Sequence, residues 1–352
     1  MKSRALVVIT ALGASGCSFA PSNGAVGGDG HQPPDTSGSA GRDANPDAPV
    51  GTEATIPVDA LPILPDAPPG SCMARWRSGT PPQFGTAASL FISAADSTQR
   101  DPTFSPDERT LYFASNLTTT KTEYWFVSIG AGGTVSSSPV PSDALGSGAI
   151  GNDGEGKMTM DAAFTDVFFA SDRGGTDVLR HTHRGTSGPF GTPDQAGLAA
   201  VNLAGTHLAD PQLAGGGLHL YYASDDGNRT QHIYMATRSD PTAAWGPGVP
   251  FTMNLDSMHG DADPSLSVDE STILFSSQRP GGVGGTDIYY ATRESAGGNF
   301  GPVQPVPGVN TTKDEGDPVL SKDGCSIVFA TDRNGTSALD YDIWAIDMTN
   351  PS

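Results

Sequence analysis

DPVLSKDGCSIVFATDRNG, residues 317–335, is one of several similar stretches in this chain of 352 residues. It has a short apolar run after Asp-Pro, the turn residues Ser-Lys-Asp-Gly, a second apolar run rich in β-branched residues, and a final Asp-Arg-Asn-Gly. Such runs between turn residues are typical of neighbouring antiparallel β-strands. DPSLSVDESTILFSSQRPGG (263–282) and DPTFSPDERTLYFASN (101–116) repeat the pattern.

The second apolar run recurs along the whole C-terminal part of the chain. Its copies are displaced by 56, 53, 53 and 54 residues, and they lie at 111–115, 167–171, 220–224, 273–277 and 327–331. A third run follows each copy, and a weaker fourth run follows a Phe-Gly or Trp-Gly pair. Four short antiparallel strands per unit at this period indicate the blades of a β-propeller, an all-β fold in which each blade covers the faces of its neighbours.

The number of runs predicts five blades. The first three runs occur five times, and a copy of the fourth run lies at the front, where residues 83–93 match residues 298–308. We therefore expect the N-terminal strand to complete the last blade and close a domain that spans residues 71–352. Residues 72–79 (CMARWRSG) faintly resemble a third strand, which leaves a sixth, imperfect blade as an alternative.

The unit DPxxSxDGxxLxFxSDRxGxxDIY resembles the WD40-like repeat of TolB-type propellers over residues 98–348. The match is best in the last two units and poorest in the second, where Lys157-Met158 replaces Asp-Pro. The resemblance implies the propeller fold. Similar propellers serve as periplasmic interaction platforms, as accessory domains of peptidases and as envelope lipoproteins, so the fold does not decide the function.

The N-terminus predicts export. Lys2 and Arg4 precede an apolar run at 5–14 that is too short to span a bilayer as a mature helix. ASGC at 14–17 resembles a bacterial lipobox, with alanine where most have leucine, and implies that Cys17 is lipidated and becomes the new N-terminus. An ordinary cleaved signal peptide is the alternative. Ser18 after the cysteine implies the outer membrane, on its periplasmic or surface face.

Residues 18–70 are predicted to be a disordered tether. They are rich in proline, glycine, serine and aspartate, and they cannot bury enough apolar surface to offset the entropy lost on folding. The whole chain has 39 acidic and 19 basic residues, a formal net charge of −20. Because nucleic-acid binding requires cations that neutralise phosphates, we expect no nucleic-acid partner.

Two cysteines remain, Cys72 at the start of the propeller and Cys325 in its last repeat. Export makes a disulfide between them chemically possible, and it would tie the two ends of the domain together. Two buried free thiols are the alternative. Two cysteines alone do not make a metal site.

Four aspartates precede proline at the innermost strand of a repeat: Asp101, Asp210, Asp263 and Asp317. The ring would place them around one mouth of its central channel, with Asp261 and Glu315 adding charge nearby. Crowded carboxylates raise one another's pKa or recruit a cation such as calcium, so a cation or basic-peptide site is one hypothesis. The alternative is structural, because aspartate accepts backbone hydrogen bonds in turns.

Other polar patterns favour structural roles. Arg279 and the Asp-Arg pairs at 172–173 and 332–333, together with Asp177, Asp287 and Asp342, are expected to form inter-strand salt bridges and turn caps. His181 and His183 share one face of a strand, as zinc ligands would, but no third ligand is evident. No Gly-x-Ser-x-Gly elbow and no cofactor motif is present.

The sequence therefore predicts a lipid-anchored envelope propeller that is a monomer and a non-enzymatic scaffold for an envelope protein or peptide. It carries no predicted catalytic residue and no predicted cofactor. A glycan-binding or glycan-hydrolysing five-bladed propeller, using non-equivalent carboxylates of the channel, is the alternative.

Overall fold

The computed structural model divides the chain into two units, residues 1–61 and 62–352. The residues that the structure describes are 70–90, 97–116, 122–130, 133–142, 155–172, 177–186, 188–203, 207–225, 230–252, 254–294, 297–335 and 340–349. The expected signal peptide, Cys17 and the tether, apart from Gly70, lie outside these ranges. Within them, no helix has the length and apolar character needed to cross a bilayer.

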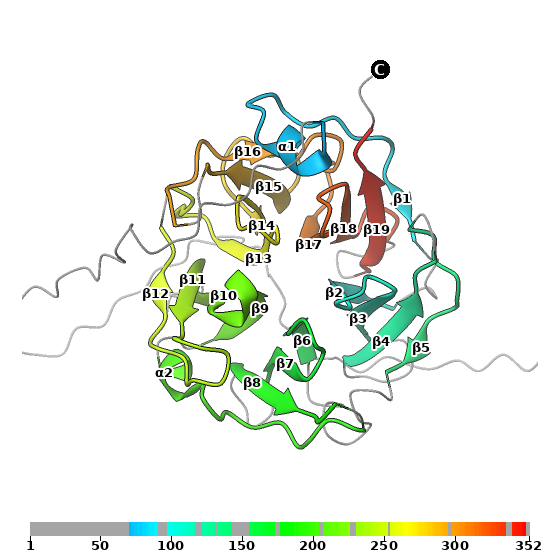
Figure 1. The fold of residues 1–352 in the computed structure, drawn as a ribbon. Coiled ribbons are helices and arrows are strands. Elements are labelled where there is room, and N and C mark those ends of the chain that lie inside the picture. Colours follow the sequence, from blue (N-terminus) through cyan, green and yellow to red (C-terminus); the bar gives the residue numbers. More distant parts are fainter. Residues whose placement is uncertain are drawn as a thin grey trace, which may run out of the picture. The chain divides into compact units, whose positions relative to one another are not determined.

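Residues 62–352 form an all-β propeller of five blades arranged as a ring (Figure 1). The innermost strands are β2 (Gln99–Phe104), β6 (Glu155–Met160), β9 (Leu208–Ala214), β13 (Asp261–Leu266) and β17 (Glu315–Leu320). The second strands are β3 (Thr110–Ser115), β7 (Asp166–Ser171), β10 (His219–Asp225), β14 (Thr272–Ser277) and β18 (Ser326–Thr331). The third strands are β4 (Glu123–Ser128), β8 (Val178–His183), β11 (Gln231–Thr237), β15 (Asp287–Thr292) and β19 (Asp342–Asp347).

The fourth strands are the short outer ones: β5 (Val140–Pro141), β12 (Val249–Pro250), β16 (Gln304–Pro305) and β1 (Ala88–Ser89). We number the blades in chain order by their innermost strands, from blade 1 with β2 to blade 5 with β17. Blade 2 has three strands, with an isolated bridge between His181 and Asp194 where the other blades have their fourth strand. A helical turn, α2 (Ala199–Asn202), follows in this blade, and a 3-10 turn, η3 (Gly215–Gly217), links β9 to β10.

The ring closes as predicted, because β1 pairs with β19 and completes blade 5. Ala88 lies opposite Ala345 and Ser89 opposite Trp344, and a further bridge joins Phe84 to Met348. The prediction of five blades is confirmed. The alternative of a sixth blade is wrong, because residues 72–76 form the helix α1 (Cys72–Trp76) instead of a third strand.

A disulfide and a hydrogen bond connect helix α1 to the turn between β17 and β18. Cys72 and Cys325 form a disulfide, and the Trp76 indole N–H donates to the Gly324 carbonyl at 2.9 Å. Gly324 has φ of 71°, and a Cβ there would collide with Met73. Glu108 and Glu270 have the same left-handed backbone at the equivalent turns, so glycine at 324 serves the close approach of the helix.

The core consists of the layers between neighbouring blades. All six residues of β14 are buried, because this strand is covered on both faces. Leu274 and Ile288 of blade 4 pack with Ile327 and Phe329 of blade 5 in one apolar cluster. Since each blade is covered only by its neighbours, one blade cannot remain folded alone.

Candidate functional site at the ring axis

Each Asp-Pro pair produces a β-bulge in an innermost strand. In blade 4, Ala262 pairs with Ser276 and Ser265 pairs with Leu274, so Asp263 and Pro264 together oppose a single residue of β14. The aspartates have a left-handed backbone, with φ of 58° at Asp101, 53° at Asp210, 54° at Asp263 and 51° at Asp317. Aspartate tolerates this region better than most residues, and proline, which lacks an N–H, is tolerated where a bulge interrupts the ladder.

The aspartates link neighbouring blades at the axis. The backbone N–H of Asp317 donates to Asp263 Oδ2 at 3.2 Å, and the N–H of Asp101 donates to Asp317 Oδ2 at 3.3 Å. The Ser276 hydroxyl also donates to Asp263 Oδ2. The structure thus brings the predicted residues together, each as the third residue of its innermost strand, and the donors that they bind come from the adjacent blade as well as from their own.

Lys157 occupies the same position in blade 2. Its side chain is 1% exposed, and its ammonium donates to the carbonyls of Pro264 at 3.2 Å and Pro318 at 3.3 Å, across the axis in blades 4 and 5. The sequence showed this substitution only as a poor repeat. The fold turns it into a buried cation whose charge, with that of Arg100, acts on the carboxyl groups at the axis.

The pKa values of the four carboxyl groups are shifted in different directions. Burial, followed by the charge of Asp263, raises the pKa of Asp101 to about 6 and raises the pKa values of Asp210 and Asp317 well above the ordinary range. Burial acts in the same direction on Asp263, but Lys157, the Ser276 hydroxyl and Asp210 outweigh it and lower its pKa. Asp263 is therefore the carboxylate that stays ionised beside the ammonium, as expected when carboxyl groups share one site.

This arrangement predicts a propeller that is more stable in mild acid than at neutral pH. A carboxyl whose pKa is raised on folding contributes stability below its ordinary pKa of 3.8 and loses it as pH rises through the folded value, about 6 for Asp101. The free energy of unfolding of the wild type should therefore fall between pH 4.5 and 7.5. We expect this fall to be smaller in Asp101→Asn by on the order of 1–2 kcal/mol, measured by urea unfolding. Asp323→Asn, in an exposed turn, is the control, and an unchanged slope in Asp101→Asn would contradict the assignment.

The structure shows no set of metal ligands among the described residues, either at the axis aspartates or at His181 and His183. Among the described residues, no three His, Cys, Asp or Glu side chains are placed to hold a metal ion. At the axis, the Lys157 ammonium already supplies a cation to the carboxyl groups. His181 Nε2 and His183 Nδ1 lie 2.6 Å and 3.1 Å from the same oxygen of Asp166, which ties both rings to one carboxylate.

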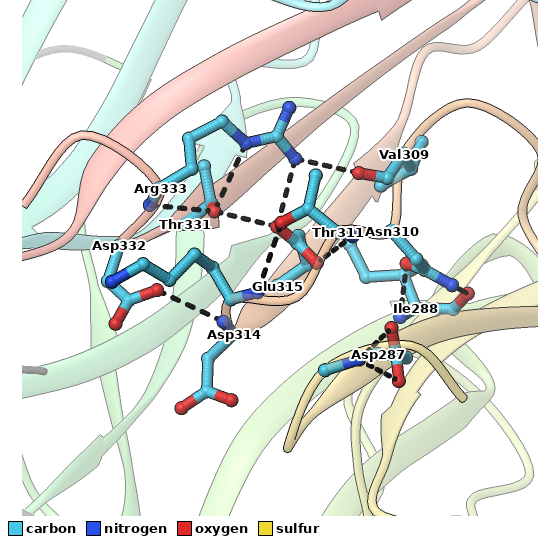
Figure 2. Close-up of polar contacts among 12 residues, drawn as sticks. Asp287, Ile288, Val309, Asn310, Thr311, Asp314, Glu315, Thr331, Asp332 and Arg333 are labelled. Atoms are coloured by element: carbon cyan, nitrogen blue, oxygen red, sulfur yellow. Dashed lines mark hydrogen bonds and ion pairs between the residues drawn. The ribbon is translucent and has the colours of Figure 1, made fainter. Parts of the chain in front are cut away.

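The arginines after the second strands form buried ion pairs, but with partners other than those predicted. Arg279 pairs with Asp261 at 2.7 Å, and Arg333 pairs with Glu315 at 3.0 Å while also donating to the Val309 carbonyl (Figure 2). Asp261 and Glu315 therefore add no free charge to the axis. Asp287 caps its turn instead, accepting the Val283 N–H at 2.9 Å.

An asparagine that recurs in two blades has a structural role that the sequence analysis did not predict. The Asn202 side chain bonds both the N–H and the carbonyl of Leu179, and Asn310 bonds Ile288 in the same way. Each asparagine follows the outer segment of one blade and holds the start of the third strand. The signal was present as Val-Asn at 201–202 and 309–310.

The chain matches no protein-family model and no curated protein sequence. Its fold is similar to that of TolB from Agrobacterium tumefaciens, at 14% identity and a TM-score of 0.44 over 78% of this chain and 88% of that one. TolB from Acinetobacter baumannii gives 16% identity and a TM-score of 0.44, over 75% of this chain. The match spans little more than half of that protein, 57%.

A solved structure of another functional class is also similar in fold. A glycoside hydrolase has 11% identity and a TM-score of 0.52, with 80% of this chain and 95% of that chain covered. At such identities the likeness establishes the five-bladed fold alone. The choice between a binding protein and an enzyme has to come from the chemistry of this chain.

Proposed function

We propose that this protein is a lipid-anchored scaffold of the bacterial cell envelope whose propeller binds another envelope protein or a peptide without catalysing a reaction. The observation that supports a non-enzymatic role is the set of charged residues at the axis. One stands in each blade at the same repeat position, and hydrogen bonds from one blade to another hold Lys157, Asp101 and Asp317. A general acid or base must instead reach a substrate.

The cysteines support export. Two of the three cysteines form the Cys72–Cys325 disulfide, a bond that persists in oxidising compartments such as the periplasm. Cys17 is left over, in the lipobox-like ASGC. A lipid on Cys17 would then anchor the chain to the membrane, most simply the outer membrane because Ser18 follows it.

Glycan hydrolysis is the second candidate, and one observation favours it. The pKa of Asp210 is raised while that of its neighbour Asp263 is lowered, and a pair divided in this way has the properties of a general acid and a base. The two carboxyls are repeat-equivalent and bond one another, which leaves less room for a sugar between them than the separated pair of a glycosidase.

Affinity capture tests the scaffold. The soluble fragment 71–352, immobilised and exposed to envelope extract, is expected to retain a discrete partner identified by mass spectrometry, while uncoated resin does not. In parallel, the wild-type chain and the variants Asp210→Asn and Asp263→Asn are assayed on a panel of glycans. Turnover by the wild type that both variants lose more than about a hundredfold would replace the scaffold with the hydrolase.

A further inference from the structure

The two faces of the ring differ in what they carry. The connector face consists of the segments that lead into the innermost strands, such as 254–260 and 309–314, and the loops between second and third strands, such as 278–286. The turn face consists of the turns between first and second strands, such as 267–271 and 321–325, and the ends of the third strands. Pairing of Asp261 with Ser277, and of Ser277 with Asp287, puts these strand ends at one edge of blade 4.

The described chain begins and ends at the turn face. Helix α1 lies against Gly324 through Trp76, and Cys72 is bonded to Cys325 in the same turn. At the other end, the Met348 N–H donates to the Cys325 carbonyl at 2.7 Å. The described chain, from Gly70 to Thr349, therefore enters and leaves the propeller at the turn face.

The connector face of blades 3 and 4 exposes large apolar side chains. Met258, which precedes β13, is 89% exposed, and Leu203, which ends the corresponding segment before β9, is 87% exposed. Val283, in the loop between β14 and β15, is 59% exposed. On the turn face of blade 4, Val268 is 69% exposed and gives a matched position for comparison.

The described chain has more cations on the turn face than on the connector face, while both faces carry many carboxylates. The cations of the turn face include Arg109, Arg184, Arg238 and Lys322, and Arg293 there is paired with the buried Glu270. Carboxylates stand beside them in the same turns, among them Asp107, Glu108, Asp240 and Asp269. On the connector face of blades 4 and 5, Arg279 and Arg333 are taken up by buried carboxylates, which leaves the exposed Lys313 as the third described cation there.

Several carboxylates of the connector face accept hydrogen bonds from backbone N–H groups. Asp314 accepts the Thr286 N–H at 2.9 Å, and Asp332 accepts the Asp314 N–H at 3.0 Å (Figure 2). This face therefore combines negative charge with exposed apolar side chains. Such a surface is complementary to a cationic segment that carries apolar residues.

We propose that the connector face, around Met258, Leu203 and Val283, is the docking surface of the propeller, and that it binds a cationic segment with apolar side chains from a partner protein. This inference rests on the proposed scaffold function and names its face and ligand chemistry. The chain's own residues 18–70 have seven acidic residues and one arginine, and a second copy has the same charge of −20, so both are repelled from this surface.

A peptide titration tests the face. The probe is an amidated 12-residue peptide of four lysines, four leucines and four glycines, titrated by fluorescence anisotropy into the full chain at several salt concentrations. Met258→Lys is expected to weaken binding at least about tenfold, because it removes an apolar contact and adds repulsion, and added salt is expected to weaken wild-type binding. Val268→Lys adds the same charge to the turn face of the same blade, and we expect less than about a twofold change.

The outcomes separate this inference from the function on which it rests. Equal weakening by the two variants, or none by either, would overturn the assignment of the face. If a partner is captured from envelope extract but the cationic peptide does not bind, the ligand chemistry proposed here is wrong and the scaffold stands. If neither binds, both proposals fall.

Discussion

Lys157→Met is expected to destabilise the propeller by about 3–5 kcal/mol at pH 7, the usual cost of removing one partner from a buried ionic cluster. Methionine keeps most of the volume of the lysine stem but cannot donate to the carbonyls of Pro264 and Pro318, 3.2 Å and 3.3 Å from the ammonium. It also leaves Asp263, the ionised carboxylate, without its cation. Urea unfolding followed by circular dichroism measures the change.

Acid should partly rescue this variant. When pH falls towards 5, Asp263 can take up a proton and the uncompensated charge disappears, so the deficit of Lys157→Met is expected to shrink. Lys313→Met removes an exposed lysine on the connector face and is the matched control, with an expected change within about 0.5 kcal/mol. A loss below about 1 kcal/mol at pH 7 for Lys157→Met would show that the carboxyls do not depend on the lysine.

Removing the disulfide is expected to lower the free energy of unfolding by about 2–5 kcal/mol. The bond joins residues 253 positions apart and so restricts the unfolded chain. The double variant Cys72→Ser/Cys325→Ser avoids a lone thiol. Guanidinium unfolding should show a lower midpoint for this variant than for the oxidised wild type.

Reductant provides the internal control. It should lower the midpoint of the wild type to that of the double variant and leave the double variant unchanged. Because β1 pairs with β19 independently of the sulfurs, the reduced ring should still fold and keep its β-sheet circular dichroism. Unfolding of the reduced chain in the absence of denaturant would mean that the pairing of β1 does not hold the ring closed.

The local pattern of the sequence was enough for the fold. Short apolar runs between turn residues identify strands, because a strand covered on both faces is apolar along its length and turn residues end it. The match of residues 83–93 to 298–308 identifies the strand that closes the ring. The pattern failed at residues 72–76. Ser71 caps that segment by accepting the Ala74 N–H, and the segment forms a helix whose Trp76 is buried against blade 5.

The site could be predicted only in part. Repetition singled out Asp101, Asp210, Asp263 and Asp317. The ion pairs of Arg279 and Arg333, however, join an arginine that follows the second strand to a carboxylate 18 positions earlier, at the start of the innermost strand, whereas the sequence predicts nearer partners. His181 and His183 share the carboxylate of Asp166 on the adjacent strand. The sequence did not show which residues of the two strands lie opposite each other, so this contact could not be predicted.

By itself, the sequence determined the five repeated four-strand units, the closing N-terminal strand and the position of one charged residue per unit, because these follow from periodicity and local turn chemistry. The tertiary structure alone decided what those charges do. Residues more than a hundred positions apart, such as Lys157 and Pro264, meet only when the ring closes. Burial there raises some carboxyl pKa values and lowers another, and no linear pattern records how far each group has been removed from water.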